Sequence, residues 1–134
     1  VGSEMCIRDS NISVSLREPD SDVLVQYYDY LSGLEWLTPE WLIICGHDWH
    51  YFDGARRARQ LLTHHDDRLK QLVNIDEPQT TADAITRLFP MELTDHEIYF
   101  ASREARAHLN HLVTRGELWR ENSNGIAVFS RTGT

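Results

Sequence analysis

The sequence contains little cysteine, a single lysine and no long hydrophobic run. Only two cysteines occur in 134 residues, and Cys45 alone lies outside the first ten. A lone thiol in an apolar stretch excludes a disulfide framework and predicts a reducing, cytoplasmic compartment. No stretch of about 18 apolar residues exists, so no membrane contact is expected. Lys70 is the only lysine among 13 basic residues, and the net charge of −8 opposes loose electrostatic attraction to nucleic acid.

Residues 1–10 are interpreted as an artefact that carries no folding information. The codons GTG GGC TCG GAG ATG TGT ATA AGA GAC encode the first nine residues, VGSEMCIRD. That DNA resembles a transposase adapter used to build sequencing libraries. The segment also lacks the apolar centre of a signal peptide. We therefore expect residues 1–10 to have no consistent place in the fold, and the reading frame to begin inside a gene.

A short apolar stretch from Trp41 to Cys45 ends in Gly46 and His47. Its β-branched residues predict a buried strand of a sheet that is covered on both faces. Ligands and metals gather just past the carboxyl ends of strands in α/β sheets, so His47 stands where a metal ligand is expected. A loop histidine without a role is the alternative that spacing alone leaves open.

Amphipathic patterns lie on both sides of this stretch. Residues 11–16 alternate as a half-buried strand or extended segment, and apolar spacing predicts helices over residues 23–37 and 55–74. His64 and His65 in the second helix are adjacent, so they do not point the same way. A structural hydrogen bond or a solvated face is favoured there over a metal site.

A polar connection at residues 74–78 marks the expected boundary between domains at 11–75 and 76–134. Beyond it, a capped helix begins near Thr80, and a capping box at Thr94 opens a long helix that Gly116 ends. Short strands at 117–121 and 126–130 flank an Asn-Gly pair, a strong hairpin signal. Helices followed by a two-stranded wing predict a winged-helix module.

The order of these elements resembles the C-terminal part of metallo-β-lactamase-fold hydrolases with an appended winged helix. In that family the corresponding strand ends in Pro-Gly-His-Gly, and its histidine is a zinc ligand. Here Cys45 replaces the proline and Asp48 replaces the second glycine. His64 and Arg68 match a histidine and an arginine of the family. The resemblance implies an α/β fold, namely the C-terminal fragment of an αββα sandwich followed by a winged helix.

The resemblance also implies a zinc-dependent hydrolase, with two ions in the full-length protein, that activates water against an ester, thioester, lactone or phosphodiester. His47 supplies one metal bond on this interpretation. Asp48 either orients that imidazole or is a surface carboxylate, and His50 is a loop residue. The family's His-x-His-x-Asp-His motif is absent, so the N-terminal metal-binding half is missing. Since catalytic zinc needs at least three protein ligands, we expect an inactive fragment without tightly bound zinc. The apolar faces of residues 23–37 and 41–45 should be partly uncovered.

The alternative function is a winged-helix nucleic-acid-binding protein. Arg103, Arg106, Asn110 and Arg115 then form the exposed polar face of the long helix and contact phosphates and bases. Acidic residues in the same module and the overall charge argue against DNA. A small-molecule substrate or single-stranded RNA is the expected partner, since some relatives with this tail cleave RNA. The sequence leaves the oligomeric state open.

Overall fold

The computed structural model describes residues 12–45 and 49–133. The expectation for residues 1–10 therefore lies outside the described residues. Within them the chain is a mixed α/β structure with four helices and two small antiparallel sheets. In chain order the elements are α1 (Val23–Ser32), β1 (Leu42–Ile43), β2 (Tyr51–Phe52), α2 (Gly54–Val73), β3 (Gln79–Thr80), α3 (Thr81–Leu88), α4 (Asp95–Thr114), β4 (Leu118–Ser123) and β5 (Ile126–Arg131).

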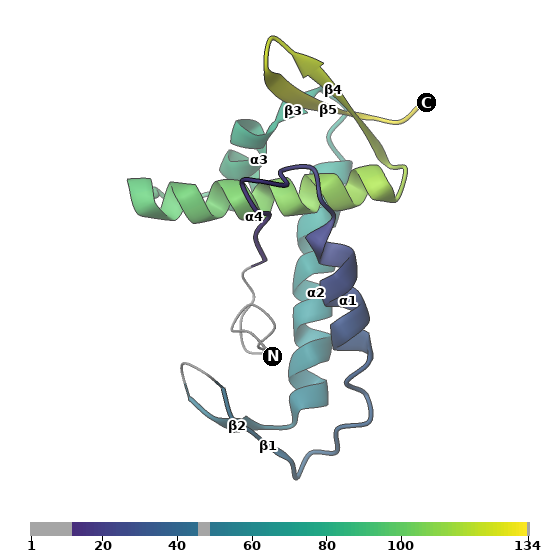
Figure 1. The fold of residues 1–134 in the computed structure, drawn as a ribbon, viewed down its shortest axis with the longest axis vertical. Helices are drawn as coiled ribbons and strands as arrows, with labels where there is room; N and C mark the ends of the chain where they lie inside the picture. Colours follow the sequence, from purple (N-terminus) through teal and green to yellow (C-terminus); the bar gives the residue numbers. More distant parts are fainter. Residues whose placement is uncertain (1–11, 46–48, 134) are drawn as a thin grey trace.

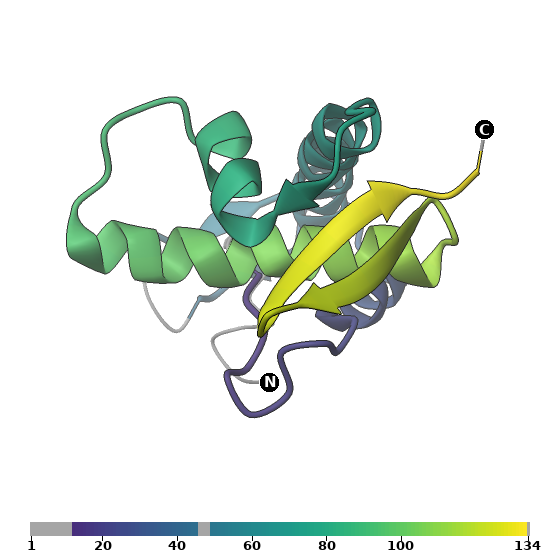
Figure 2. The same ribbon diagram turned by 90° about the horizontal axis from the view of Figure 1, so that it is seen from above.

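The long helix α4 lies across the ends of the paired helices α1 and α2 (Figure 1). On the opposite side of α4 lie α3 and the sheet formed by β3, β5 and β4 (Figure 2). Buried apolar side chains connect all these layers in one core that extends from Ile12 to Phe129. The predicted boundary at residues 75 and 76 stays a prediction, although this core has members on both sides of it.

Local signals set the ends of α3 and α4 as the sequence predicted. The hydroxyl of Thr94 accepts a hydrogen bond from the backbone N–H of Glu97, and the Glu97 carboxylate accepts one from the backbone N–H of Thr94. An equivalent capping box opens α3. At the far end of α4, Gly116 adopts φ +74°, and its N–H and that of Glu117 donate to the carbonyls of Val113 and Leu112. This is a Schellman motif, which a left-handed glycine permits without strain.

The predicted hairpin is present, and it gains a third strand. Asn124 and Gly125 have φ values of +52° and +82°, as a two-residue type I′ turn requires, and they join β4 to β5. On its other edge β5 pairs with β3, where Gln79 lies opposite Phe129. The sequence pattern did not predict this short strand.

Residues 12–22 form a strap that crosses α4, so of the two alternatives predicted for residues 11–16, the strand is not found among the described residues. The backbone N–H of Val14 donates to the carbonyl of Arg103, and the Arg103 Nε donates back to the Val14 carbonyl at 2.8 Å. Asn110 donates to the carbonyls of Pro19 and Ser21 at 2.8 and 2.9 Å. The segment pairs with a helix and with side chains, so it has no strand partner among the described residues.

The predicted strand at 41–45 is also corrected. Only Leu42 and Ile43 are paired, as β1, with Phe52 and Tyr51 of β2. These two strands make a ribbon at the end of α2 that is far from α4 (Figure 1). Only one face of the predicted strand is covered, because Ile43 packs against the core and Leu42 is 47% exposed. The preceding helix ends at Ser32 instead of residue 37, since Gly33 follows it and the chain continues in tight turns.

Candidate functional site

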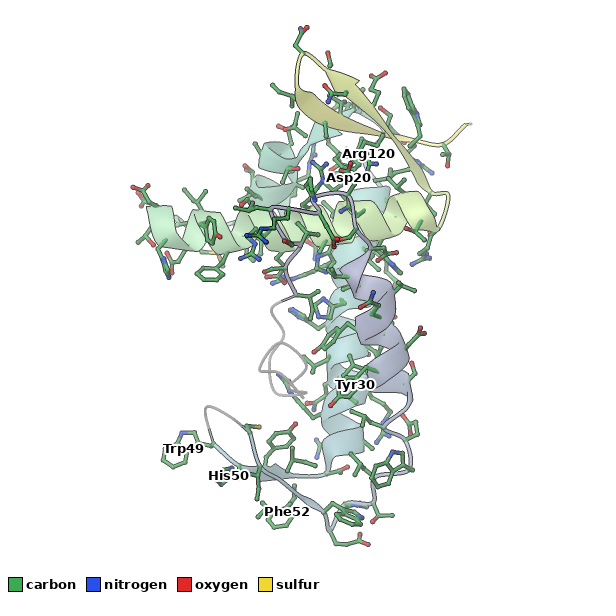
Figure 3. All side chains as sticks on the ribbon, viewed as in Figure 1. Asp20, Tyr30, Trp49, His50, Phe52 and Arg120 are labelled. Carbon is green, nitrogen blue, oxygen red and sulfur yellow. The ribbon has the colours of Figure 1, made fainter. Side chains whose placement is uncertain are left out.

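The predicted metal ligand His47 lies outside the described residues, together with Gly46 and Asp48. Its assignment as a zinc ligand therefore stays a prediction. His50 is exposed on the ribbon and lies far from α4 (Figure 3). Its place next to Trp49 and ahead of β2 agrees with a loop residue, as the sequence suggested.

A different group of ligand-type side chains lies in the core, where α2 meets α4. His65 comes from α2, and Glu104 and His108 come from α4. One potential ligand atom from each residue lies within 4.8 Å of the other two. Glu104 and His108 are four residues apart, so the helix places them on one face. His65 and His108 are fully buried and Glu104 is 7% exposed.

The hydrogen bonds of this cluster determine which ring nitrogens carry protons. Burial lowers the pKa of His65 to about 3 and that of His108 to about 4, so both rings are neutral at pH 7. The Nδ1 atom of His108 lies 2.8 Å from the carbonyl oxygen of Glu104, which only accepts, so this nitrogen carries the proton. Its Nε2 atom then presents a lone pair to Nδ1 of His65, 3.0 Å away. The Nε2 atom of His65 is buried and has no hydrogen-bond partner among the described residues.

Arg68 completes the cluster through an ion pair with Oε1 of Glu104. Its guanidinium carbon lies 4.7 Å from the ring centroid of Phe89, a cation–π contact that fixes the arginine. Burial raises the pKa of the Glu104 carboxyl to about 7, and the nearby Arg68 opposes this rise. His64 is half-buried with its ring in edge contact with that of His65, the centroids 5.2 Å apart, and burial followed by Arg68 lowers its pKa. The structural hydrogen bond that the sequence favoured for this histidine pair is found at His65.

Two further polar contacts join the helices around the cluster. His111 Nδ1 lies 3.0 Å from a carboxylate oxygen of Asp22, and this carboxylate also caps α1. The Tyr28 hydroxyl donates to Asp66 at 2.8 Å. Burial, followed by this hydrogen bond, raises the pKa of Tyr28. Both contacts have a structural role, because each connects α1 to a neighbouring helix.

The prediction of an exposed polar face on α4 is wrong for Arg103, Arg106 and Asn110, whereas Arg115 is exposed and pairs with Glu117. Asn110 is 1% exposed and holds the strap, as does Arg103. Arg106 pairs with Asp20 at 2.7 Å and lies over the ring of Phe129. Figure 3 shows Arg120 facing the same Asp20, 3.3 Å away. Arginine side chains of this region therefore hold the protein's own N-terminal strap.

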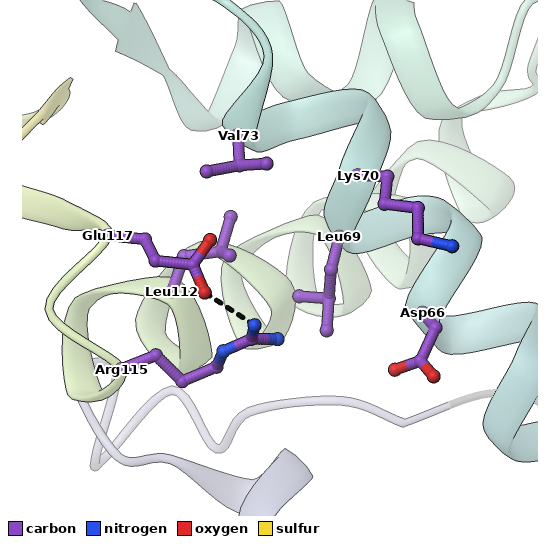
Figure 4. Close-up of a pocket in the computed structure, with 7 residues that line it drawn as sticks. All are labelled: Asp66, Leu69, Lys70, Val73, Leu112, Arg115 and Glu117. Atoms are coloured by element: carbon purple, nitrogen blue, oxygen red, sulfur yellow. Dashed lines mark ion pairs between the residues drawn. The ribbon is translucent and has the colours of Figure 1, made fainter.

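A cavity of about 210 Å³ lies near the C-terminal ends of α2 and α4 (Figure 4). Arg115 and Glu117 form an ion pair of 2.5 Å on one side of it, and Asp66 and Lys70 lie on the other side. Its two positive and two negative groups balance, so it has no clear preference for an ion of either sign. It shares no lining residue with the buried cluster.

The comparisons with known proteins agree with this architecture. Residues 69–132 match the family model for the C-terminal domain of metallo-β-lactamase-like proteins. Residues 69–132 form a metallo-β-lactamase-like C-terminal domain. The whole chain is similar to a β-lactamase domain protein from Burkholderia ambifaria, with a TM-score of 0.85 and 33% identity over 91% of this chain and 37% of that chain. It is also similar to a metallo-β-lactamase family protein from Thermus thermophilus, with a TM-score of 0.65 and 26% identity over 83% of this chain and 34% of that chain.

The chain thus spans little more than a third of the length of the two solved structures. No curated protein sequence matches it. Among the described residues, no helix is both long and apolar enough to cross a membrane.

The buried cluster was missed by the sequence analysis. The Glu104-x-x-x-His108 spacing on a predicted helix was a usable signal, because it places a carboxylate and an imidazole on one face. The third member, His65, lies 43 residues before His108. No local pattern could show that the two helices bring these residues together.

Proposed function

We propose that this chain is the C-terminal part of a metal-dependent hydrolase of the metallo-β-lactamase superfamily, and that it is inactive by itself. The observation that carries the proposal is 33% identity over 91% of the chain to a β-lactamase domain protein that is much longer. In such an enzyme, bound zinc lowers the pKa of water and so supplies hydroxide against an ester, thioester, lactone or phosphodiester. Single-stranded RNA belongs to the last of these substrate classes.

In this proposal His47 contributes one ligand to the zinc site and the remaining ligands come from a preceding half. The ribbon formed by β1 and β2 is then the part that contacts that half. Its apolar side chains support this, since Ile44 is 73% exposed and Trp49 is 81% exposed. Exposed apolar surface of this kind marks an interaction site. Cys45, a reduced cysteine in the same stretch, suits a reducing, cytoplasmic setting.

We propose that α3 and α4 with the wing formed by β4 and β5 make up the winged-helix module predicted for residues 76–134, and that α2, which precedes the predicted boundary, supplies its third helix. In this proposal the module supports the hydrolase domain. The alternative, a nucleic-acid-binding function, is less favoured, because three of its four predicted contact residues, Arg103, Arg106 and Asn110, hold the strap, and Arg115 pairs with Glu117.

The test is metal analysis and turnover on the full-length protein recovered from the complete gene. His47→Ala should reduce the zinc content and lower turnover of ester, lactone or RNA substrates steeply. His50→Ala, three residues further along the chain, is the matched control, and it should change neither quantity. If His47→Ala leaves both zinc content and turnover unchanged, the strand-end histidine has no metal role. A full-length sequence without further metal-ligating motifs would remove the hydrolase proposal itself.

A further inference from the structure

The buried cluster of His65, Glu104 and His108 takes no part in the proposed hydrolase chemistry, which depends on His47. It lies at the crossing of α2 and α4, inside the core and not on the ribbon. Buried polar groups are costly unless they have partners or bind an ion. In this cluster Nδ1 of His65 faces Nε2 of His108 across 3.0 Å, and one ligand atom from each of the three residues lies within 4.8 Å of the others.

The orientation of His108 has the form expected of a metal ligand. A metal-bound histidine usually donates its other ring N–H to a carbonyl or carboxylate, which fixes the ring and its tautomer. His108 does this with the Glu104 carbonyl at 2.8 Å, so its Nε2 lone pair faces His65. The two facing nitrogens are 3.0 Å apart. Two ligands about 2.0–2.1 Å from a zinc ion in tetrahedral geometry lie about 3.3 Å apart, so a shift of a few tenths of an ångström suffices.

We propose that His65, Glu104 and His108 form a binding site for one divalent transition-metal ion that joins α2 to α4. Two imidazoles and one carboxylate are a ligand set found with Zn²⁺, whereas Ca²⁺ and Mg²⁺ prefer oxygen ligands throughout. Arg68 pairs with Oε1 of Glu104, and Oε2 is the oxygen assigned to the ion. Water takes the fourth position.

Arg68 has two opposite effects on this site. Its contact with Phe89 and its ion pair hold the Glu104 carboxylate in place, which favours binding of the ion by reducing the ordering required. Its positive charge repels a cation and lowers the affinity. The net result is a buried site of moderate affinity that joins two helices. The prediction that this chain holds no tightly bound zinc considered His47 alone, and it stays a prediction for the buried cluster.

The experiment uses the 134-residue chain, in which His47 lacks the family's other ligand motifs. Co²⁺ titration followed by visible absorbance, and Zn²⁺ titration followed by calorimetry, should each give one ion per chain. Zn²⁺ should also raise the melting temperature. Glu104→Gln keeps the size of the side chain and can still accept from Arg68, but it supplies a much poorer ligand. We expect it, and separately His65→Gln, to weaken binding by about tenfold or more.

Two controls separate this site from adventitious binding by other histidines. His50→Ala removes an exposed imidazole of the ribbon, and His96→Ala removes an exposed one from α4 itself. Both should bind one Co²⁺ as the unaltered chain does. The proposal is overturned if the unaltered chain shows no cobalt spectrum. It is also overturned if folded Glu104→Gln and His65→Gln, checked by circular dichroism, bind the ion as tightly as the controls.

Discussion

The body formed by α2, α3, α4 and the three-stranded sheet differs sharply from the ribbon formed by β1 and β2. In the body, helix ends are capped, the hairpin is fully paired, and the buried amide of Asn110 donates to the strap. In the ribbon, two residues pair with two, and the apolar side chains of residues 41–52 are largely exposed. The body therefore buries its apolar surface within this chain, whereas the ribbon does not.

This difference teaches how to interpret an apolar run in a partial sequence. The stretch at 41–45 is as apolar as a buried strand, but a strand is buried only when other elements cover it. Among the described residues, β2 is the only strand that pairs with β1. In the body the apolar residues of α4 meet α2, α3 and the sheet. The hydrophobicity of a segment thus predicts that its side chains are buried against other residues. It does not predict that those residues belong to the same chain.

The largest expected effect is loss of core packing in the body but not in the ribbon. Leu109 on α4 is fully buried, so Leu109→Ala should lower the free energy of unfolding by about 2–5 kcal/mol. Leu42 in β1 is 47% exposed, and Leu42→Ala should cost only about 0.5 kcal/mol. Urea denaturation followed by circular dichroism measures both. Equal losses at the two leucines would mean that the ribbon is part of the cooperative core.

A smaller effect is expected from two glycines at helix ends. Gly116 has φ +74°, where a side chain is strained, so Gly116→Ala should destabilise the chain by about 1–2 kcal/mol. Gly33 after α1 has φ −73°, and an added Cβ meets two carbonyl oxygens at 3.4 Å, an ordinary contact. Gly33→Ala should therefore be neutral or stabilise by about 0.5 kcal/mol. Thermal unfolding of both variants gives the comparison. A cost as large at Gly33 as at Gly116 would contradict the backbone explanation.

The capping box of α4 should give a weaker, pH-dependent effect. Hydrogen bonds from the backbone N–H and then the hydroxyl of Thr94 lower the pKa of Glu97. A carboxyl with a lowered pKa in the folded state stabilises fully above its unfolded pKa, and this contribution is lost as pH falls through its folded pKa. Glu97→Gln should thus be less stable than the unaltered chain at pH 7, with the difference shrinking towards about pH 3. Urea unfolding at several pH values tests this, and a difference independent of pH would contradict it.

The smallest effect on stability, although not on solubility, is expected at the ribbon aromatics. Trp49 and Phe52 (Figure 3) are 81% and 61% exposed, so replacing both with Ser should change the free energy of unfolding by about 0.5 kcal/mol or less. The double variant should bind less of a hydrophobic dye and associate less in light scattering. Trp119→Ser, on β4 of the body, is the control. If Trp119→Ser reduces dye binding as much as the double variant does, the ribbon is not the main exposed apolar surface of the chain.

The sequence was a good guide where the determining interactions are local. Thr94 with Glu97, Gly116 and the pair Asn124-Gly125 each act within a few residues, and the structure has the predicted caps and turn. The structure also agrees with the resemblance to the metallo-β-lactamase family over residues 69–132.

The sequence was a poor guide where partners are distant along the chain. Arg103 and Asn110 have the polar character of a nucleic-acid-binding face, and only the folded chain shows that they hold residues 12–22. The pairing of β3 with β5 and the contact of His65 with His108 also join residues far apart in sequence. Composition and periodicity show which side chains are suited to burial or to polar contacts. They do not show which distant residues these side chains contact.

The strap at residues 12–22 has a consequence for the order of events during synthesis. Asn110 holds Pro19 and Ser21 across 91 and 89 positions of the chain, so this segment cannot dock until α4 has left the ribosome. Closing so long a loop has an entropic cost that only late contacts repay. The earliest part of the described chain to be made is therefore among the last to reach its final place. Until then, the surface of α4 beneath it is open to chaperones or to another copy of the chain.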